Sequence, residues 1–174
     1  MNLRDLITPE RILVDPPDRE KKPLLATLAA LLFDGADTII DTYSVEAKRL
    51  GKDETRPGAL FFFCRTAGNV PLKMALALFH QPFCLPGEEQ AHSLVFLFSQ
   101  PAEAPGYPLD ILSQLSRLLL RSELVERLLA AATPQACCTV LQDDLVLMER
   151  EGGERRQDEA RGPDDRRSQD RRQH

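Results

Sequence analysis

The sequence predicts a single α/β domain in which helices flank a mixed β-sheet on both faces. Three short apolar runs, residues 59–64, 74–79 and 94–99, contain almost no alternating polar positions and are bounded by Pro or Gly. Strands that are apolar on both faces belong in a sheet that is covered on both sides. Leucines at helical spacing before and after these runs supply the covering helices.

The N-terminal part predicts a short turn at residues 8–11, a strand at residues 12–14 and then two helices. The first helix is expected to start between residues 19 and 22, with Pro23 in its first turn, and to end at Gly35. A second helix is predicted over residues 38–50, with Gly51 as its stop.

The C-terminal part predicts three helices and a charged tail. One helix follows leucines 109, 112, 115 and 119, the next is capped by Ser122, and the last starts at Thr133-Pro134 and runs to about residue 148. Residues 1–148 therefore form the domain. Residues 149–174 are predicted to be disordered, because they are highly charged and hold almost no apolar side chains.

Charge and composition exclude several classes of protein. The net charge is −5, and the arginines of the tail are interleaved with as many acids, which argues against a nucleic-acid-binding arm. No apolar run is long enough to insert into a membrane, and the start MNLRDLITPE has no secretory signal pattern, so we expect a cytoplasmic protein.

Neither a metal nor another cofactor is expected. Cys64, Cys84, Cys137 and Cys138 form no C-x-x-C motif, and we expect them to be reduced and mostly buried. The three histidines, at positions 80, 92 and 174, are scattered and form no zinc-binding pattern.

Three stretches together resemble a known family. They are LRDLITPERILVD at residues 3–15, LVFLFSQPAEAP at 94–105 and LDILSQLSRLLLRSELVERLLAA at 109–131. In order and spacing they are similar to the type-2 enzyme IIA domain of the bacterial phosphoenolpyruvate-dependent sugar phosphotransferase system (PTS). This family includes the fructose and mannitol IIA domains and the nitrogen-regulatory IIA proteins. The resemblance covers about residues 1–145 and implies a mixed sheet flanked by helices.

The resemblance also implies that the phosphohistidine site of the family is degenerate here. In the family a Gly-rich loop leads into a strand that ends in Pro-His, and this histidine carries the phosphate. Alignment on Gly51 and Gly58 places Phe62-Phe63 at the Pro-His pair and Pro57 at the second histidine of sugar-specific members. Phenylalanine has no nucleophilic atom, so no catalytic residue is expected at this position.

The loop itself is also replaced. Residues 52–57 read KDETRP, in which Asp53 and Glu54 would repel a phosphate dianion and Pro57 removes a backbone donor. Arg56 and Arg65 are candidate contacts for an anion or a partner.

Other residues could carry phosphate instead. Cys64 directly follows the lost histidine position, and His80 and His92 each adjoin a predicted strand.

The resemblance implies a regulatory pseudoenzyme that binds a protein, since nitrogen-regulatory relatives bind kinases and transporters. The partner would be the PTS phosphocarrier protein, a kinase or a transporter. Phe61-Phe62-Phe63 would dock it if part of this cluster reaches the surface; the alternative is that the three side chains belong to a two-sided core strand. Two alternatives stay open: an active phosphocarrier with a non-standard acceptor, and a sensor that binds a small ligand in the vacated pocket. Whether the protein is an enzyme is thus undecided at this point.

Overall fold

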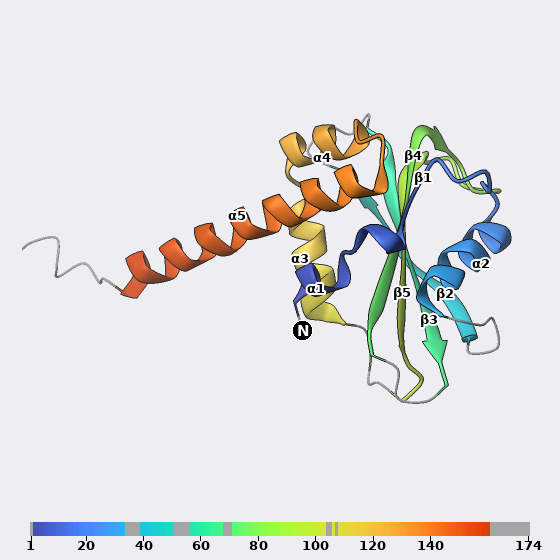
Figure 1. Ribbon diagram of the computed structural model, residues 1–174, viewed down its shortest axis with the longest axis horizontal. Coiled ribbons are helices and arrows are strands. Elements are labelled where there is room, and N and C mark those ends of the chain that lie inside the picture. Colours follow the sequence, from blue (N-terminus) through green and yellow to red (C-terminus); the bar gives the residue numbers. More distant parts are fainter. Residues whose placement is uncertain are drawn as a thin grey trace, which may run out of the picture.

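A computed structural model describes residues 2–33, 39–50, 56–67, 71–103, 106 and 108–160, with the backbone alone described for 39–49 and 157–160. Its elements, in chain order, are α1 (Leu3–Leu6), the 3-10 turn η1 (Pro9–Arg11), β1 (Ile12–Val14), α2 (Lys21–Leu32), β2 (Ile39–Arg49), β3 (Gly58–Thr66), β4 (Lys73–Phe83), β5 (His92–Pro101), α3 (Leu109–Leu119), α4 (Ser122–Leu129) and α5 (Pro134–Ala160). Figure 1 shows α2 on one side of the sheet and the other helices on the opposite side.

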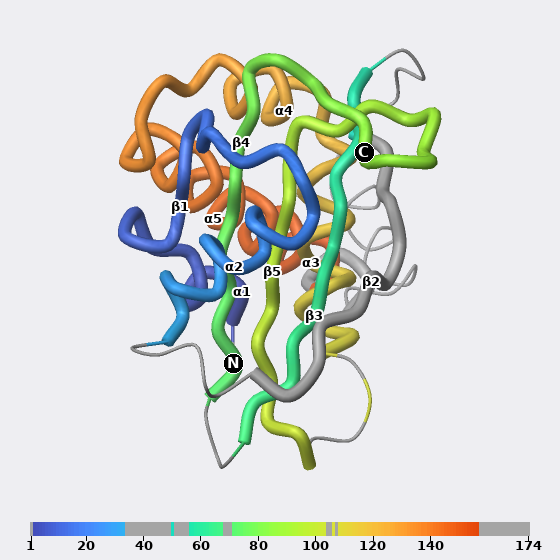
Figure 2. Tube along the Cα trace, turned by 90° about the vertical axis from the view of Figure 1, so that its right-hand side faces the viewer, coloured from blue at the N-terminus to red at the C-terminus, as the bar shows by residue number. Residues whose placement is uncertain are grey.

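The five strands form one mixed sheet in the order β1-β4-β5-β3-β2. β1 pairs with β4 and β3 pairs with β5 in parallel, whereas the β4–β5 and β2–β3 pairs are antiparallel. Figure 2 shows β1, β4, β5 and β3 side by side, with α2 in front of them and α3 and α5 behind. The predicted mixed sheet with helices on both faces is confirmed.

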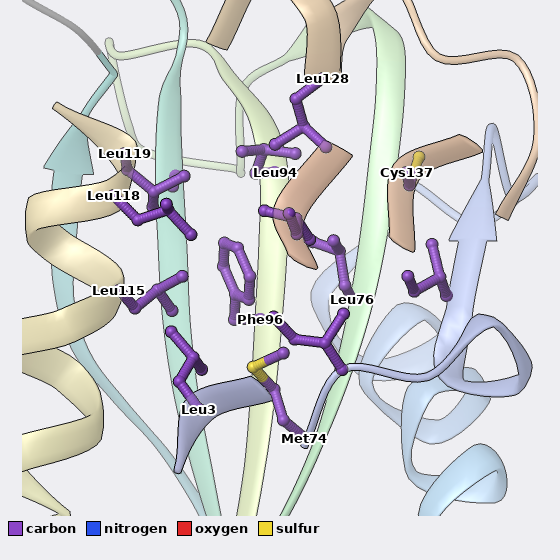
Figure 3. Close-up of a cluster of buried hydrophobic side chains, with 14 of the residues drawn as sticks. Leu3, Met74, Leu76, Leu94, Phe96, Leu115, Leu118, Leu119, Leu128 and Cys137 are labelled. Carbon is purple, nitrogen blue, oxygen red and sulfur yellow. The ribbon is translucent and has the colours of Figure 1, made fainter. Parts of the chain in front are cut away.

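Alternate side chains of the central strands fill two separate cores. On the α2 side the sheet buries Leu60, Phe62, Cys64, Ala75, Ala77, Phe79, Val95 and Leu97 beneath the leucines of α2. On the other side it buries Phe61, Phe63, Met74, Leu76, Leu78, Leu94, Phe96 and Phe98 against α1, α3, α4 and α5. Figure 3 shows this second core, where Phe96 lies between Leu115 of α3 and Leu76 of β4. The absence of polar alternation in the three apolar runs follows from this two-sided burial.

Two of the predicted helix starts are confirmed, and the predicted cap of a third helix is wrong. Pro23 is the third residue of α2, where its missing amide hydrogen costs little. Thr133 caps α5, since its Oγ1 accepts a hydrogen bond of 3.1 Å from the Ala136 amide. The prediction that Ser122 caps α4 is wrong: the cap position is Arg121, without a side-chain cap, and Ser122 is the first helical residue.

The helix predicted over residues 38–50 is also wrong, because residues 39–49 form β2. The segment IIDTYSVEAKR is rich in β-branched and aromatic residues, which favour strands. It pairs with β3 from Ile39 opposite Thr66 to Arg49 opposite Gly58, so it covers the outer edge of β3 along its length. Gly35 and Gly51, the two predicted stops, lie outside the described residues.

The C-terminal segment predicted as disordered begins as helix. α5 continues to Ala160, twelve residues beyond the predicted end at 148, while residues 161–174 lie outside the described part of the chain. Residues 149–160 contain four Glu and three Arg, which have high helix propensity although they bury little apolar surface. In the described part of the chain, no helix is both long and apolar enough to cross a membrane.

Removing the α5 cap tests how this helix is anchored. We expect Thr133→Ala to lower the free energy of unfolding by about 1 kcal/mol, because the Ala136 amide loses its acceptor. Thr139→Ala, at an exposed position of the same helix, is the matched control and should change it by less than about 0.5 kcal/mol. Urea unfolding of the two variants measures both values, and equal effects would contradict the capping role.

Candidate functional site

Phe63, which the sequence analysis predicts to stand at the acceptor-histidine position of the resembled family, lies in the core. Its side chain is 0% exposed and its ring stacks on Phe98 of β5, with centroids 5.1 Å apart and planes 18° apart. Phe61 meets Phe96 edge to ring at 5.3 Å on the same face, and Phe62 is buried on the α2 face. The interpretation of the three phenylalanines as a two-sided core strand is therefore confirmed, and they form no exposed docking patch.

The thiol of Cys64 is poorly suited to nucleophilic chemistry. Its side chain is buried, and this burial raises its pKa to about 11, so it stays protonated near neutral pH. Burial also raises the pKa of the Cys137 thiol to about 11. All four cysteines are free thiols, and three are buried as expected, whereas Cys84 is exposed.

Arg56 and Arg65 do not form one anion site. Arg56 precedes β3 and pairs with Glu126 of α4, with Nη2 and Oε1 2.6 Å apart. Arg65 is exposed near the other end of β3, opposite Gln100 of β5. With a rise of about 3.3 Å per residue, nine residues of extended chain separate the two by about 30 Å. The guanidinium of Arg56 instead fastens the start of β3 to α4.

His80 holds three segments together, in a group that we call the His80 clasp: His80, Asp15 and Ala131. The imidazole Nδ1 lies 2.5 Å from Oδ2 of Asp15, and the His80 amide donates to Oδ1 at 2.8 Å. On the other side of the ring, Nε2 lies 2.8 Å from the carbonyl oxygen of Ala131. Asp15 follows β1 and has a positive φ of 48°, which lets its carboxylate turn toward β4.

Both ring nitrogens of His80 face acceptors, so the imidazolium form satisfies both contacts. The hydrogen bond to Asp15 is the main cause that raises the pKa of His80 above its ordinary value of 6.5, and burial acts in the opposite direction. The same hydrogen bond lowers the pKa of Asp15. With both nitrogens engaged, neither has a free lone pair to accept phosphate in this conformation.

His92 is buried at the start of β5 and is remote from Phe63. Its Nε2 lies 3.0 Å from Oε2 of Glu88, while its Nδ1 has no hydrogen-bond partner among the described residues. His92 pairs with Gly58, five residues before Phe63 in β3. The register thus places Phe63, opposite Phe98, away from the end of the sheet where His92 pairs with Phe83 and where His80 lies in the irregular stretch of β4 after Leu78.

Sequence reasoning singled out His80 but missed Asp15 and Ala131. The signal is the parallel pairing of β1 with β4, which places Val14 opposite Leu78 and so brings the ends of both strands together. That register cannot be read from composition. Across the described residues, no three His, Cys, Asp or Glu side chains are grouped so that they could hold a metal ion.

Comparison with known proteins relates this geometry to a family. No protein-family model matches the chain. A curated nitrogen regulatory protein from Pseudomonas aeruginosa is 29% identical over an alignment of 151 residues that covers 82% of this chain and 96% of that protein. The crystal structure of nitrogen regulatory protein IIA-Ntr from Neisseria meningitidis superposes with a TM-score of 0.57 at 17% identity, over 80% of this chain and 98% of that one. The resemblance to nitrogen-regulatory IIA proteins is confirmed.

The IIA-like chain spans nearly the whole length of both relatives. At 17% identity the structural match shows that the fold is shared, and it does not assign a chemistry to any residue. The residues at positions 57 and 63 are therefore judged on their own surroundings. The ring at position 63 is buried and stacks on Phe98, and position 57 holds a proline just before β3.

The His80 clasp predicts a specific dependence of stability on pH. The raised pKa of His80 contributes stability that is fully present below pH 6.5 and is lost as pH rises through the folded-state pKa. The lowered pKa of Asp15 contributes stability that is present above 3.8 and is lost as pH falls through its folded-state value. The His80 clasp should therefore stabilise the folded protein most between about pH 3.8 and pH 6.5, where His80 is protonated and Asp15 is ionised.

We expect His80→Gln to cost more stability at about pH 5.5 than at about pH 8.5, because only the wild type loses a charged contact over this range. Asp15→Asn should reduce the same pH dependence, because it removes the carboxylate that raises the pKa of His80. The side-chain oxygen of the asparagine can still accept a hydrogen bond from the His80 backbone amide. Urea unfolding of the three proteins at both pH values provides the measurement. A cost of His80→Gln that is equal at both pH values would show that the clasp is not charged.

Proposed function

We propose that this IIA-like chain is a regulatory domain that binds a protein partner and does not carry phosphate at the position used by its family. The observation that carries the proposal is Phe63, which aligns with the acceptor histidine and is a fully buried ring stacked on Phe98. The fold is kept while the residue that would do the chemistry is part of the core.

Phosphoryl transfer between histidines needs a nitrogen lone pair, donors for the phosphate oxygens and access for the donor protein. Phe63 supplies none of these. The other candidate acceptors each lack one requirement, since the Cys64 thiol is buried with a pKa of about 11 and both ring nitrogens of His80 are engaged. His92 is buried and held by Glu88.

A regulatory role is supported by the relatives, because both the similar curated protein and the similar solved structure are named nitrogen regulatory proteins. We infer a protein partner of the kind such proteins have: the PTS phosphocarrier protein, a kinase or a transporter. The small-ligand sensor receives less support, because the rings of Phe61, Phe63, Phe96 and Phe98 pack on one another at the place where a ligand cavity would be needed.

Intact-mass spectrometry tests the phosphate part of the proposal. After incubation with phosphoenolpyruvate, enzyme I and the phosphocarrier protein, we expect no gain of about 80 Da, the mass of one phosphoryl group. A histidine-bearing IIA protein in the same reaction should be labelled. Labelling of this chain would contradict the proposal, and fragment mapping to His80, His92 or Cys64 would then identify the acceptor.

Restoring the histidine gives a second test. We expect Phe63→His to lose about 3 kcal/mol of stability, because a polar ring replaces a stacked aromatic one in the core, and still to take up no phosphate. Phe63→Leu is the control for lost ring packing alone and should cost less. Stability is measured by urea unfolding and phosphate by intact mass. Uptake by Phe63→His would show that the rest of the phosphate site is intact, against our proposal.

A further inference from the structure

A groove of about 460 Å³ lies between α3 and α5, on the side of the molecule away from α2. We call it the α3–α5 groove. It is lined by Asn2 before α1, by Gln114 and Arg117 of α3, and by Leu145, Met148, Glu149, Gly152, Gly153 and Arg156 of α5. Its volume falls in the range of about 300 to 1,000 Å³ that is typical of binding pockets.

The groove continues the face by which α5 packs on the domain. Residues 145, 148, 149, 152 and 156 of α5 recur at intervals of three and four, so they lie along one side of the helix. Leu141 and Leu145 of α5 are buried. Figure 1 shows α5 running on beyond α3 and α1, and residues 149–151 and 153–156 of α5 are exposed.

Two glycines keep this face open. A Cβ atom built on Gly152 or Gly153 would meet nothing within 4 Å, so no neighbouring side chain requires glycine here. Each glycine lowers the stability of a helix interior by about 1 kcal/mol relative to alanine. The pair therefore weakens α5 without any packing reason inside the domain, and its effect is an open surface beside Met148.

The charge of the groove is opposite to that of the whole chain. Arg117 and Arg156 are exposed, and neither forms an ion pair with the described side chains around it. The lining also contains one acid, Glu149, whose Oε1 accepts a hydrogen bond of 2.7 Å from the neutral amide Nδ2 of Asn2, so two arginines and one glutamate leave the groove with one excess positive charge. The chain as a whole carries a net charge of −5.

Two neighbouring arginines, Arg121 and Arg127, do form ion pairs. Arg127 is hydrogen-bonded to the buried carboxylate of Asp144, and Arg121 contacts both Asp144 and Glu151. These contacts fasten α5 to α4 and to the turn after α3. Arg117 and Arg156 have no such structural task and flank the apolar floor made by Leu145 and Met148.

We propose that the α3–α5 groove binds an acidic segment of a partner protein. Carboxylates of the segment pair with Arg117 and Arg156, and one apolar side chain rests on Met148 beside Gly152. A basic segment is repelled by the same two arginines. This inference rests on the proposed protein-binding function and names the surface and the charge of the partner.

Fluorescence anisotropy with two labelled peptides, SEELEELS and SKKLKKLS, tests the groove. We expect the acidic peptide to bind at least about tenfold more tightly than the basic one, and its binding to weaken as salt rises from about 50 to about 500 mM. Equal binding of the two peptides, or no binding of the acidic one, would overturn the proposal.

Variants locate the binding. Arg117→Gln and Arg156→Gln should each weaken binding of the acidic peptide about threefold, and the double variant should weaken it about tenfold. Arg155→Gln, an exposed neighbour on α5 that does not line the groove, is the matched control and should leave binding unchanged. Gly152→Leu should abolish binding without lowering the melting temperature, since it fills the groove and favours the helix. Unchanged binding in the double variant would overturn the assignment.

Cross-linking to partners in a cell extract, with the wild type and the double variant side by side, separates this proposal from the general one. If the wild type captures no protein, the protein-binding function fails, and the peptide assay still decides the groove. Equal capture by both proteins keeps the function and overturns the groove. Capture by the wild type alone, when SEELEELS competes for it, supports both. Self-association that Gly152→Leu abolishes would make a second copy the occupant and overturn the acidic-partner proposal.

Discussion

The structure depends on one constraint, which is that the three central strands are apolar on both faces. Residues 59–64, 74–79 and 94–98 are buried almost without exception, so neither side of the sheet can face water. α2 covers one side, and α1, α3, α4 and α5 cover the other. The placement of helices on both sides of the sheet follows from the need to close both faces.

This constraint also explains why position 63 is unsuited to phosphate chemistry. An acceptor must present a nitrogen or sulfur atom to another protein, whereas the ring of Phe63 is fully buried in the core on the face covered by α1, α3, α4 and α5. Burial also raises the pKa of the Cys64 thiol to about 11 and so keeps it protonated near neutral pH. The IIA-like fold still offers a surface for recognition, since the α3–α5 groove is lined by Asn2 and by residues of α3 and α5 and by none of β3.

The sheet, its two-sided cover and most helix boundaries could be predicted from the sequence, because apolar runs and Pro or Thr at helix starts act locally. β2 was missed because Ile39, Ile40 and Tyr43 fit a helical spacing as well as a strand, and only the open edge of β3 decides between them. Residues 149–160 were missed because charge composition predicts low burial and says little about helix propensity. The clasp was out of reach because Asp15 and Ala131 meet His80 only through tertiary contacts.

The burial of β3 is the central claim of this account, and amide hydrogen exchange measures it most directly. We predict that the amides of residues 59–64 exchange only through global unfolding, with protection equal to the full free energy of unfolding. Fast exchange at residues 61–64, independent of global stability, would contradict the account. It would mean that β3 opens in the native state and that position 63 can reach solvent.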